Sequence, residues 1–379
     1  MTREDILRVL AEIQEPFSFS VDRPAMLGRR KKSLGSTDWA ALLAMHPYRK
    51  GLEVVADKRS PVDVSDKGSL IMEVGSDQEG FIRVKFYDPE RDDSGAHMYE
   101  VEPLHLASLD RWESGPFNLI PHKDHDWLAT NVDDLAMSRF GSCVVEIKNV
   151  GSWAAQDWRG DVPPQYHWVQ CQAHMCVLES HFGGEEFDHC FLVGKLNDRE
   201  LKVFLIQRDD KFIKSAVDVL GNKWRMIQDG SADLVWAIDG SEKTIDAIKA
   251  IYPGVKGEEV CIGGLEPDVV TYLDRMRELK AIESEVRELK AKIMLGMGDA
   301  TKAVSGMFKL SYPVISGRSR LDARQAQEAH PEIPWDDFMK PGKTYRGGLR
   351  ITKSKREPNH LEVDNGKSQE FRDGDRAAA

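Results

Sequence analysis

The 379-residue sequence has few cysteines and no long apolar run. The cysteines are odd in number, irregularly spaced and without a CxxC pair, which argues against a disulfide framework or a zinc ribbon: Cys143, Cys171, Cys176, Cys190 and Cys261. No apolar stretch approaches the roughly 18 residues that span a bilayer, and the mixed charges at residues 1–5 do not resemble a signal peptide. We therefore expect an intracellular, cytoplasmic protein with reduced cysteines.

One cysteine-containing segment nevertheless has the side chains of a zinc site. Cys171 and His174 would share a face of a helix, and Cys176 follows closely. Zinc sites usually recruit ligands from two elements of structure. Buried packing of these residues is therefore the interpretation that we favour.

An excess of positive charge is also missing, because the formal net charge is −11. This excludes a nonspecific basic coat for nucleic acid but not a local basic groove. Two basic clusters, at residues 29–32 and 343–356, could follow phosphates. The second could equally be a solvated charged run. With 41% hydrophobic and 30% charged residues, the chain fits a globular protein of one large or two ordinary domains.

Hydrophobic patterns predict an α/β core with a central mixed sheet flanked by helices. Helical spacing is followed by short apolar strands and then by further helices and strands. Two strand-like runs flank the turn-rich residues 75–80 and predict a β-hairpin inserted within residues 68–90. The main segments are helices at 5–13, 39–43, 165–179 and 211–229, and strands at 143–147, 191–193 and 201–207.

The residues from 269 to 296 have a heptad pattern that predicts an amphipathic, coiled-coil type of helix. The apolar positions recur every seventh residue with a second seam between them: Tyr272, Leu279, Val286 and Ile293, then Ile282 and Leu289. The helix could pair with a partner helix, but we favour packing on its own domain. Residues 297–354 would form a small C-terminal extension, and residues 355–379 a disordered polar tail.

A short acidic and basic pattern suggests chemistry. Asp133 precedes a strand in which Glu146 and Lys148 alternate, so that these two side chains point to the same face. A carboxylate and an ammonium in an apolar strand need a metal, a partner or a cleft, because a buried unpaired charge is costly. Convergent carboxylates plus a cation are also what metal-dependent phosphodiester hydrolysis needs. A structural Glu–Lys pair is the alternative.

The surrounding motifs resemble a known family. The order Asn131-Val-Asp-Asp134, Val145-Glu-Ile-Lys148 and Gln165-Tyr-His-Trp-Val-Gln-Cys-Gln172 is similar to that of the YqaJ-type viral recombinases, relatives of phage lambda exonuclease within the PD-(D/E)xK nucleases. Upstream, Leu34-Gly-Ser-Thr-Asp38 and His46-Pro-Tyr-Arg49 resemble the opening helix and SPY-like turn of the family. The resemblance covers most of residues 28–300 and implies a nuclease domain over residues 1–268.

The resemblance also implies roles for individual residues. Asp133 and Glu146 would bind one or two Mg²⁺ or Mn²⁺ ions together with the main-chain carbonyl of Ile147, and Lys148 would orient or deprotonate water. A helix before the aspartate should supply a further glutamate. Glu102, followed by proline, fits best, and Glu53 is the fallback.

Four further positions follow from the same resemblance. Gln170 and Gln172 match the family's QxQ motif, which lines the active cleft and places Gln170 in the catalytic set and Gln172 among the residues that contact DNA. Arg30 and Thr37 fall where lambda-type exonucleases hold a terminal phosphate. Asp134 stands where the family usually has glycine.

The implied activity is 5′ to 3′ exonuclease digestion of double-stranded DNA ends, which makes single strands for a phage annealing protein. A ring-like homo-oligomer is the implied assembly. An endonuclease on the same scaffold and a non-catalytic DNA-binding recombination scaffold are the alternatives. A set of tryptophans could stack on unpaired bases, although we favour core packing for most of them: Trp112, Trp127, Trp153, Trp158 and Trp168.

Overall fold

The computed structural model forms two compact units, Met1–Gly254 and Val255–Ala379. It describes residues 1–13, 23–61, 70–88, 90, 96–104, 119–183, 186–197, 200–230, 233–252, 254, 259–305, 308–314 and 323–335. The predicted tail, the basic cluster at 343–356 and Trp112 lie outside these ranges. None of the helices in the described ranges combines the length and the apolar character needed to cross a bilayer.

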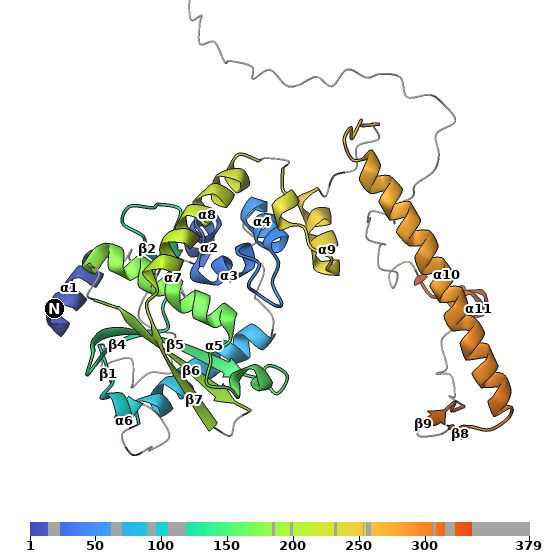
Figure 1. Ribbon diagram of the computed structural model, residues 1–379, viewed down its shortest axis with the longest axis horizontal. Helices are drawn as coiled ribbons and strands as arrows, with labels where there is room; N and C mark the ends of the chain where they lie inside the picture. Colours follow the sequence, from blue (N-terminus) through green and yellow to red (C-terminus); the bar gives the residue numbers. More distant parts are fainter. Residues whose placement is uncertain are drawn as a thin grey trace, which may run out of the picture. The chain divides into compact units, whose positions relative to one another are not determined.

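A five-stranded mixed sheet lies at the centre of the first unit (Figure 1). Its order is β1-β4-β5-β6-β7; β5 and β6 are parallel, and the other neighbours are antiparallel. The predicted fold class, a mixed sheet flanked by helices, is confirmed. The strands are β1 (Glu102–Pro103), β4 (Asp134–Ser138), β5 (Gly141–Val150), β6 (His189–Leu196) and β7 (Glu200–Gln207), with a separate pair β2 (Ile120–Pro121) and β3 (Ala129–Thr130).

Helices cover both faces of this sheet (Figure 1). α5 packs on one face through an apolar cluster, and α7 packs on the other between the sheet and a second layer that includes α3, α4 and α8. The helices of this unit are α1 (Arg3–Ile13), α2 (Arg23–Lys31), α3 (Ser36–Leu42), α4 (Gly51–Arg59), α5 (Leu70–Phe86), α6 (Ala96–Tyr99), α7 (Gln165–Phe182), α8 (Asp210–Gln228) and α9 (Glu242–Ile251), with the 3₁₀ turns η2 (Ala155–Trp158) and η3 (Val235–Ala237).

The hairpin predicted within residues 68–90 is wrong, because this segment contains the 17-residue helix α5. The alternation of apolar and polar residues around Phe81 imitates a strand. On a helix, however, Ile82 and Phe86 are four residues apart, and both are fully buried against Val145 and Phe191. This packing outweighs the roughly 1 kcal/mol that each internal glycine costs a helix.

The second unit is built around the 32-residue helix α10 (Glu266–Met297), none of whose residues is buried. Leu279 remains 48% exposed and Val286 57% exposed. Within the described residues, the predicted packing of the apolar heptad stripe on its own domain is therefore not seen. The same unit contains β8 (Lys302–Ser305) paired with β9 (Phe308–Ser311), and α11 (Ala323–Ala329).

Candidate active site

The register of β4 and β5 brings the three predicted residues together. Asp134 pairs with Val145, so Asp133 lies opposite Glu146 just before β4 begins. The Asp133 carboxylate accepts a hydrogen bond of 2.7 Å from the main-chain nitrogen of Ile147. Lys148 donates to Glu146 from the same face of β5. The Glu146 side chain is 1% exposed and that of Lys148 is 25% exposed, so the pair lies at the floor of a partly open site.

Helix α5 supplies a carboxylate that the sequence prediction missed. Glu79 hydrogen-bonds to Asp133. Arg83, one turn later, donates to the main-chain oxygen of Asp133 at 2.6 Å and lies 3.7 Å from a carboxylate oxygen of Glu79. Glu79 and Arg83 share a helix face with the buried Ile82 and Phe86. This three- and four-residue spacing was the available signal, but we interpreted the segment as a hairpin.

Glu102 does not join this group, which corrects our assignment of the helix carboxylate. Glu102 lies on the edge strand β1 opposite Met137, and its side chain is exposed. Glu53, the fallback, caps helix α4 by accepting a hydrogen bond of 2.7 Å from the Lys50 main-chain nitrogen. Among the described glutamates, Glu79 therefore takes the position that we had expected Glu102 to hold.

The site holds more negative than positive charge. Burial, Asp133 and a hydrogen bond to Asp133 raise the pKa of Glu79 to about 9. Burial and the charge of Glu146 also raise the pKa of Asp133. For Glu146, burial raises the pKa, but contacts with Lys148 and His174 outweigh it and bring the pKa down to about 2. Without an added cation, the Glu79–Asp133 pair therefore keeps a proton that ordinary carboxyls would lose.

His174 on α7 is a further residue of this site. Its ring is fully buried, with Nδ1 2.5 Å from the hydroxyl of Thr130 and Nε2 2.8 Å from Glu146 Oε2. We favoured buried packing for the segment with Cys171, His174 and Cys176. Both cysteines are indeed buried, and neither forms a disulfide. His174, in contrast, points toward Glu146 on β5.

The donor set fits a hard divalent cation. Asp133, Glu146 and Glu79 offer the oxygen ligands that Mg²⁺ and Mn²⁺ prefer, and the buried Glu146 Oε2 makes no aligned hydrogen bond within the described residues. No three His, Cys, Asp or Glu side chains of those residues already surround one point as ligands would. Lys148 and His174 now face the Glu146 oxygens, so the carboxylate would have to turn toward the cation.

The two QxQ glutamines lie in different surroundings. Gln170 is almost buried and hydrogen-bonds to His167 near Lys148. Gln172 is fully buried, donates to the main-chain oxygen of Gln207 and accepts from the main-chain nitrogen of Asp209, both at 2.8 Å. The predicted contact of Gln172 with DNA is therefore corrected to a structural role, because both ends of its amide are already paired within the protein.

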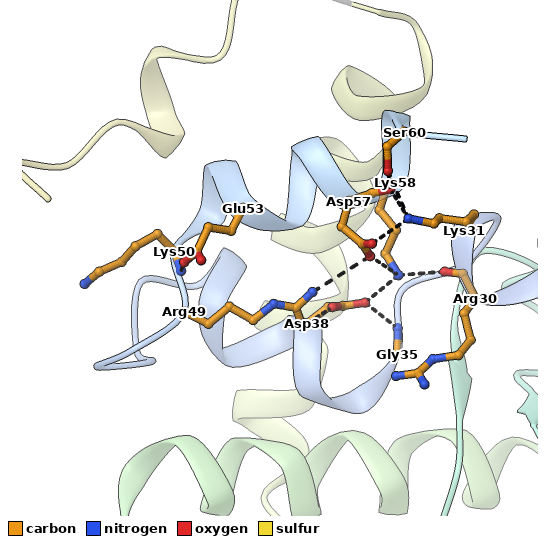
Figure 2. Close-up of polar contacts among 10 residues, drawn as sticks. All are labelled: Arg30, Lys31, Gly35, Asp38, Arg49, Lys50, Glu53, Asp57, Lys58 and Ser60. Atoms are coloured by element: carbon orange, nitrogen blue, oxygen red, sulfur yellow. Dashed lines mark hydrogen bonds and ion pairs between the residues drawn. The ribbon is translucent and has the colours of Figure 1, made fainter. Parts of the chain in front are cut away.

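Arg30 and Thr37 lie beside a second buried charged group, which we call the Asp38 cluster: Asp38, Arg49 and Lys58 (Figure 2). The Asp38 carboxylate lies 2.7 Å from Arg49 Nη1 and 2.8 Å from Lys58 Nζ. The dashed contacts of Arg30 in Figure 2 reach only its main-chain oxygen. The side chains of Arg30 and Thr37 are both exposed.

Asp134, the departure from the family pattern, is a buried structural residue. It lies 3.2 Å from Arg83 Nε and accepts a hydrogen bond from the Leu135 main-chain nitrogen. Burial raises its pKa to about 6, although Arg83 acts against this. Arg83 thus binds Asp134 with its side chain while holding the main chain of Asp133.

The tryptophans that we predicted to be core residues or stacking platforms differ in how far they are buried. Trp158 is fully buried, whereas Trp127 and Trp168 are partly buried. Trp153, which follows β5, is 75% exposed.

Residues 26–181 match the family model of the YqaJ-like viral recombinase domain. The resemblance expected from the sequence motifs is thereby confirmed, and the matched residues include Glu79, Asp133, Glu146 and Lys148. The chain is 21% identical over 320 residues to the uncharacterized protein YqaJ of Bacillus subtilis, covering 83% of this chain and 90% of that protein.

Two solved structures also align with this chain. One is an alkaline exonuclease from Laribacter hongkongensis, with a TM-score of 0.36 and 14% identity over 56% of this chain and 99% of that one. The other is a putative exonuclease from Eubacterium rectale, with a TM-score of 0.35 and 10% identity over 66% of this chain and 98% of that one.

Proposed function

We propose that this protein is a Mg²⁺- or Mn²⁺-dependent DNA exonuclease that degrades one strand of a duplex from its end in the 5′ to 3′ direction. The observation that carries this proposal is the placement of two neighbouring pairs at one edge of the sheet, Glu79 with Asp133 and Glu146 with Lys148, on segments that the β4–β5 register brings side by side. The family match over residues 26–181 supports it, since the same residues lie inside the matched domain.

In this proposal each residue of the site has a task. Asp133, Glu146 and Glu79 hold the cation, with the main-chain carbonyl of Ile147 as a further oxygen ligand. When bound, the cation supplies charge stabilisation at the phosphate and lowers the pKa of a water molecule. Lys148, kept as an ammonium by Glu146, orients the water or the scissile phosphate by donating hydrogen bonds. Gln170 lines the cleft beside this lysine.

The decisive experiment compares closed circular with linear duplex DNA in the presence of Mg²⁺ or Mn²⁺. We expect digestion of the linear duplex only, with loss of nucleotides from a 5′-labelled end before the 3′ end. Cutting of the closed circle would replace the exonuclease with an endonuclease on the same scaffold. Binding without any cleavage in either metal would favour a non-catalytic recombination scaffold.

Arg30 and Thr37 are proposed to hold the terminal 5′ phosphate, as the family resemblance implies, and the side chains of both are exposed. Arg30→Ala should slow digestion of a 5′-phosphorylated end more than that of a 5′-hydroxyl end. An equal effect on the two ends would remove Arg30 from this role.

The single strand made by this reaction is a substrate for an annealing protein, which we propose as the functional partner. The proposed homo-oligomer would keep the enzyme on its strand. Light scattering of the purified chain measures its mass in solution, and a monomer at all concentrations would contradict that assembly.

A further inference from the structure

Trp153 is unusual among the tryptophans that the structure describes, because it alone is exposed. Its side chain is 75% accessible, whereas Trp39, Trp158 and Trp224 are at most 7% accessible. Large aromatic side chains left on a surface often mark a binding site. Trp153 also lies only five residues after Lys148, in the turn that follows β5.

Trp153 does not stand alone, because Tyr48 forms the next part of the same surface. The two ring centroids lie 5.1 Å apart with an interplanar angle of 44°. Tyr48 is held from three sides. Its hydroxyl bonds to Asp157 at 3.3 Å, its main-chain nitrogen donates to His46 Nδ1 at 3.1 Å, and its main-chain oxygen accepts from Lys243. A stacking surface built on this tyrosine is therefore already ordered.

The row of rings continues from the surface to the active site. The Tyr48 and Tyr166 centroids lie 6.0 Å apart in an edge-on arrangement, and those of Tyr166 and His167 lie 4.1 Å apart. Burial and then the charge of Lys148 lower the pKa of His167 to about 3, so its ring is neutral beside the site. We call Trp153, Tyr48, Tyr166 and His167 the aromatic row. It joins an exposed tryptophan to the residues around Lys148.

Two lysines lie beside Tyr48, each paired with a carboxylate that a phosphate could replace. Lys50 lies 3.3 Å from Asp239, and Lys243 lies 3.7 Å from Glu53. These pairs are partly or largely exposed, and exposed pairs contribute little free energy. Either lysine can therefore exchange its carboxylate for a phosphate at small cost.

We propose that Trp153 and Tyr48 form a stacking platform for unpaired nucleobases of the DNA strand that runs through the active site. The inference rests on the proposed nuclease function and extends it to a subsite for single-stranded DNA. Rings stack on any base, so the platform would select for unpaired bases and not for a sequence.

The test measures binding of single-stranded DNA without cleavage. The probes are a fluorescein-labelled mixed-sequence 12-mer and a 12-mer with the same phosphates but abasic sites at its central positions, both in EDTA. Trp153→Ala should weaken binding of the intact 12-mer about 5- to 150-fold, the range that stacking of one base supplies. The same variant should leave binding of the abasic 12-mer close to that of the unchanged protein.

Two further variants serve as controls. Trp153→Phe keeps a ring and should restore most of the affinity for the intact 12-mer. Phe140→Ala removes a 51% exposed ring from the turn between β4 and β5 and should change neither affinity. Thermal unfolding of each variant checks that the loss of affinity is not a loss of fold.

Equal binding of the intact 12-mer by Trp153→Ala and the unchanged protein would overturn the platform. So would equal weakening for intact and abasic strands, because a base-stacking ring cannot act on a strand without bases. A variant that keeps DNA affinity but loses self-association would assign the surface to another protein chain. Failure of the nuclease proposal looks different, since it appears as absence of cleavage in Mg²⁺ or Mn²⁺ while the base-dependent binding persists.

Discussion

The first unit contains two buried groups of charged residues that differ in their balance of negative and positive charges. In the Asp38 cluster, one buried carboxylate faces two cations, Arg49 and Lys58, and the more exposed Asp57 lies 3.9 Å from Arg49 and 4.0 Å from Lys58. In the group formed by Glu79, Asp133, Glu146 and Lys148, three carboxylates lie near two cations, Lys148 and Arg83, and Arg83 also binds the buried Asp134. Asp38 has a lowered pKa, because Lys58 and Arg49 outweigh the effect of its burial. Asp133 and Glu79 have raised pKa values.

We infer from this difference that the Asp38 cluster is structural and that the second group is the proposed active site. A buried carboxylate with its own cations is complete and contributes to the fold. A buried set with excess negative charge is incomplete, and it is stable only with a retained proton or an added cation. The raised pKa values of Asp133 and Glu79, more than the burial of the residues, therefore distinguish the second group, in which Glu146 alone shifts in the same direction as Asp38.

The largest expected effect is on catalysis. Lys148→Ala should reduce cleavage by about 10²- to 10⁴-fold while folding and DNA binding stay largely intact, because the lysine acts on the reacting groups. Asp133→Ala should also weaken Mn²⁺ binding, measured by calorimetry. Lys214→Ala, on the exposed face of α8, is the matched control and should cleave normally. Near-normal cleavage by either active-site variant would show that the chemistry lies elsewhere.

The second effect is on stability. Asp38→Asn should lower the free energy of unfolding by about 3–5 kcal/mol, since it leaves the buried Lys58 without its anion. Urea denaturation measures this change. Asp246→Asn, which removes an exposed pair with Lys249, should cost less than about 1 kcal/mol. Similar losses for the two variants would mean that the Asp38 cluster is not a buried structural pair.

The third effect is the pH dependence of the stability that Asp38→Asn loses. Because the folded pKa of Asp38 lies below its ordinary value of 3.8, its stabilisation is present above that value and disappears as the pH falls through the folded pKa. The difference in unfolding free energy between the unchanged protein and Asp38→Asn should therefore be largest near pH 7. It should shrink below about pH 4. A difference that stays constant on acidification would contradict the ion pairing.

The last effect, a slope of at most about 1.4 kcal/mol per pH unit, should have the opposite pH dependence. Glu79 has a raised pKa of about 9, so the metal-free folded state holds a proton that the unfolded chain loses above its ordinary pKa near 4.5. The stability of the metal-free protein should therefore fall as the pH rises between these values. Glu79→Gln should remove that slope and also weaken Mn²⁺ binding. Glu102→Gln, an exposed control on β1, should change neither property.

The sequence predicted the strand-borne part of the site well, because period-two alternation places Glu146 and Lys148 on one face without further information. Asp133 followed from its position before the neighbouring strand. Glu79 could not be found in the same way. Its helix contains two glycines and an alternating apolar segment, and only packing of Ile82 and Phe86 on β5 and β6 makes it helical. The same limit applies to Gln172, whose pairing with Gln207 and Asp209 depends on where β7 ends and α8 begins.

The heptad pattern shows a different limit. Its seven-residue period correctly predicts a long helix, α10, but the period alone does not say what covers the apolar stripe. Within the described residues the stripe stays exposed. Periodicity therefore predicts the element, whereas its neighbours depend on the rest of the chain.

Gly194 on β6 pairs with Lys148 on β5, and the Trp158 indole lies directly against its backbone. A Cβ added at position 194 would come within 2.3 Å of that ring. Any side chain there would push the indole out of the core next to β5, which carries Glu146 and Lys148 of the proposed active site. Positions 158 and 194 should therefore change together in relatives of this protein, with a side chain at 194 only where 158 carries a smaller residue. Random mutagenesis followed by selection for activity should recover substitutions of Gly194 only as such pairs.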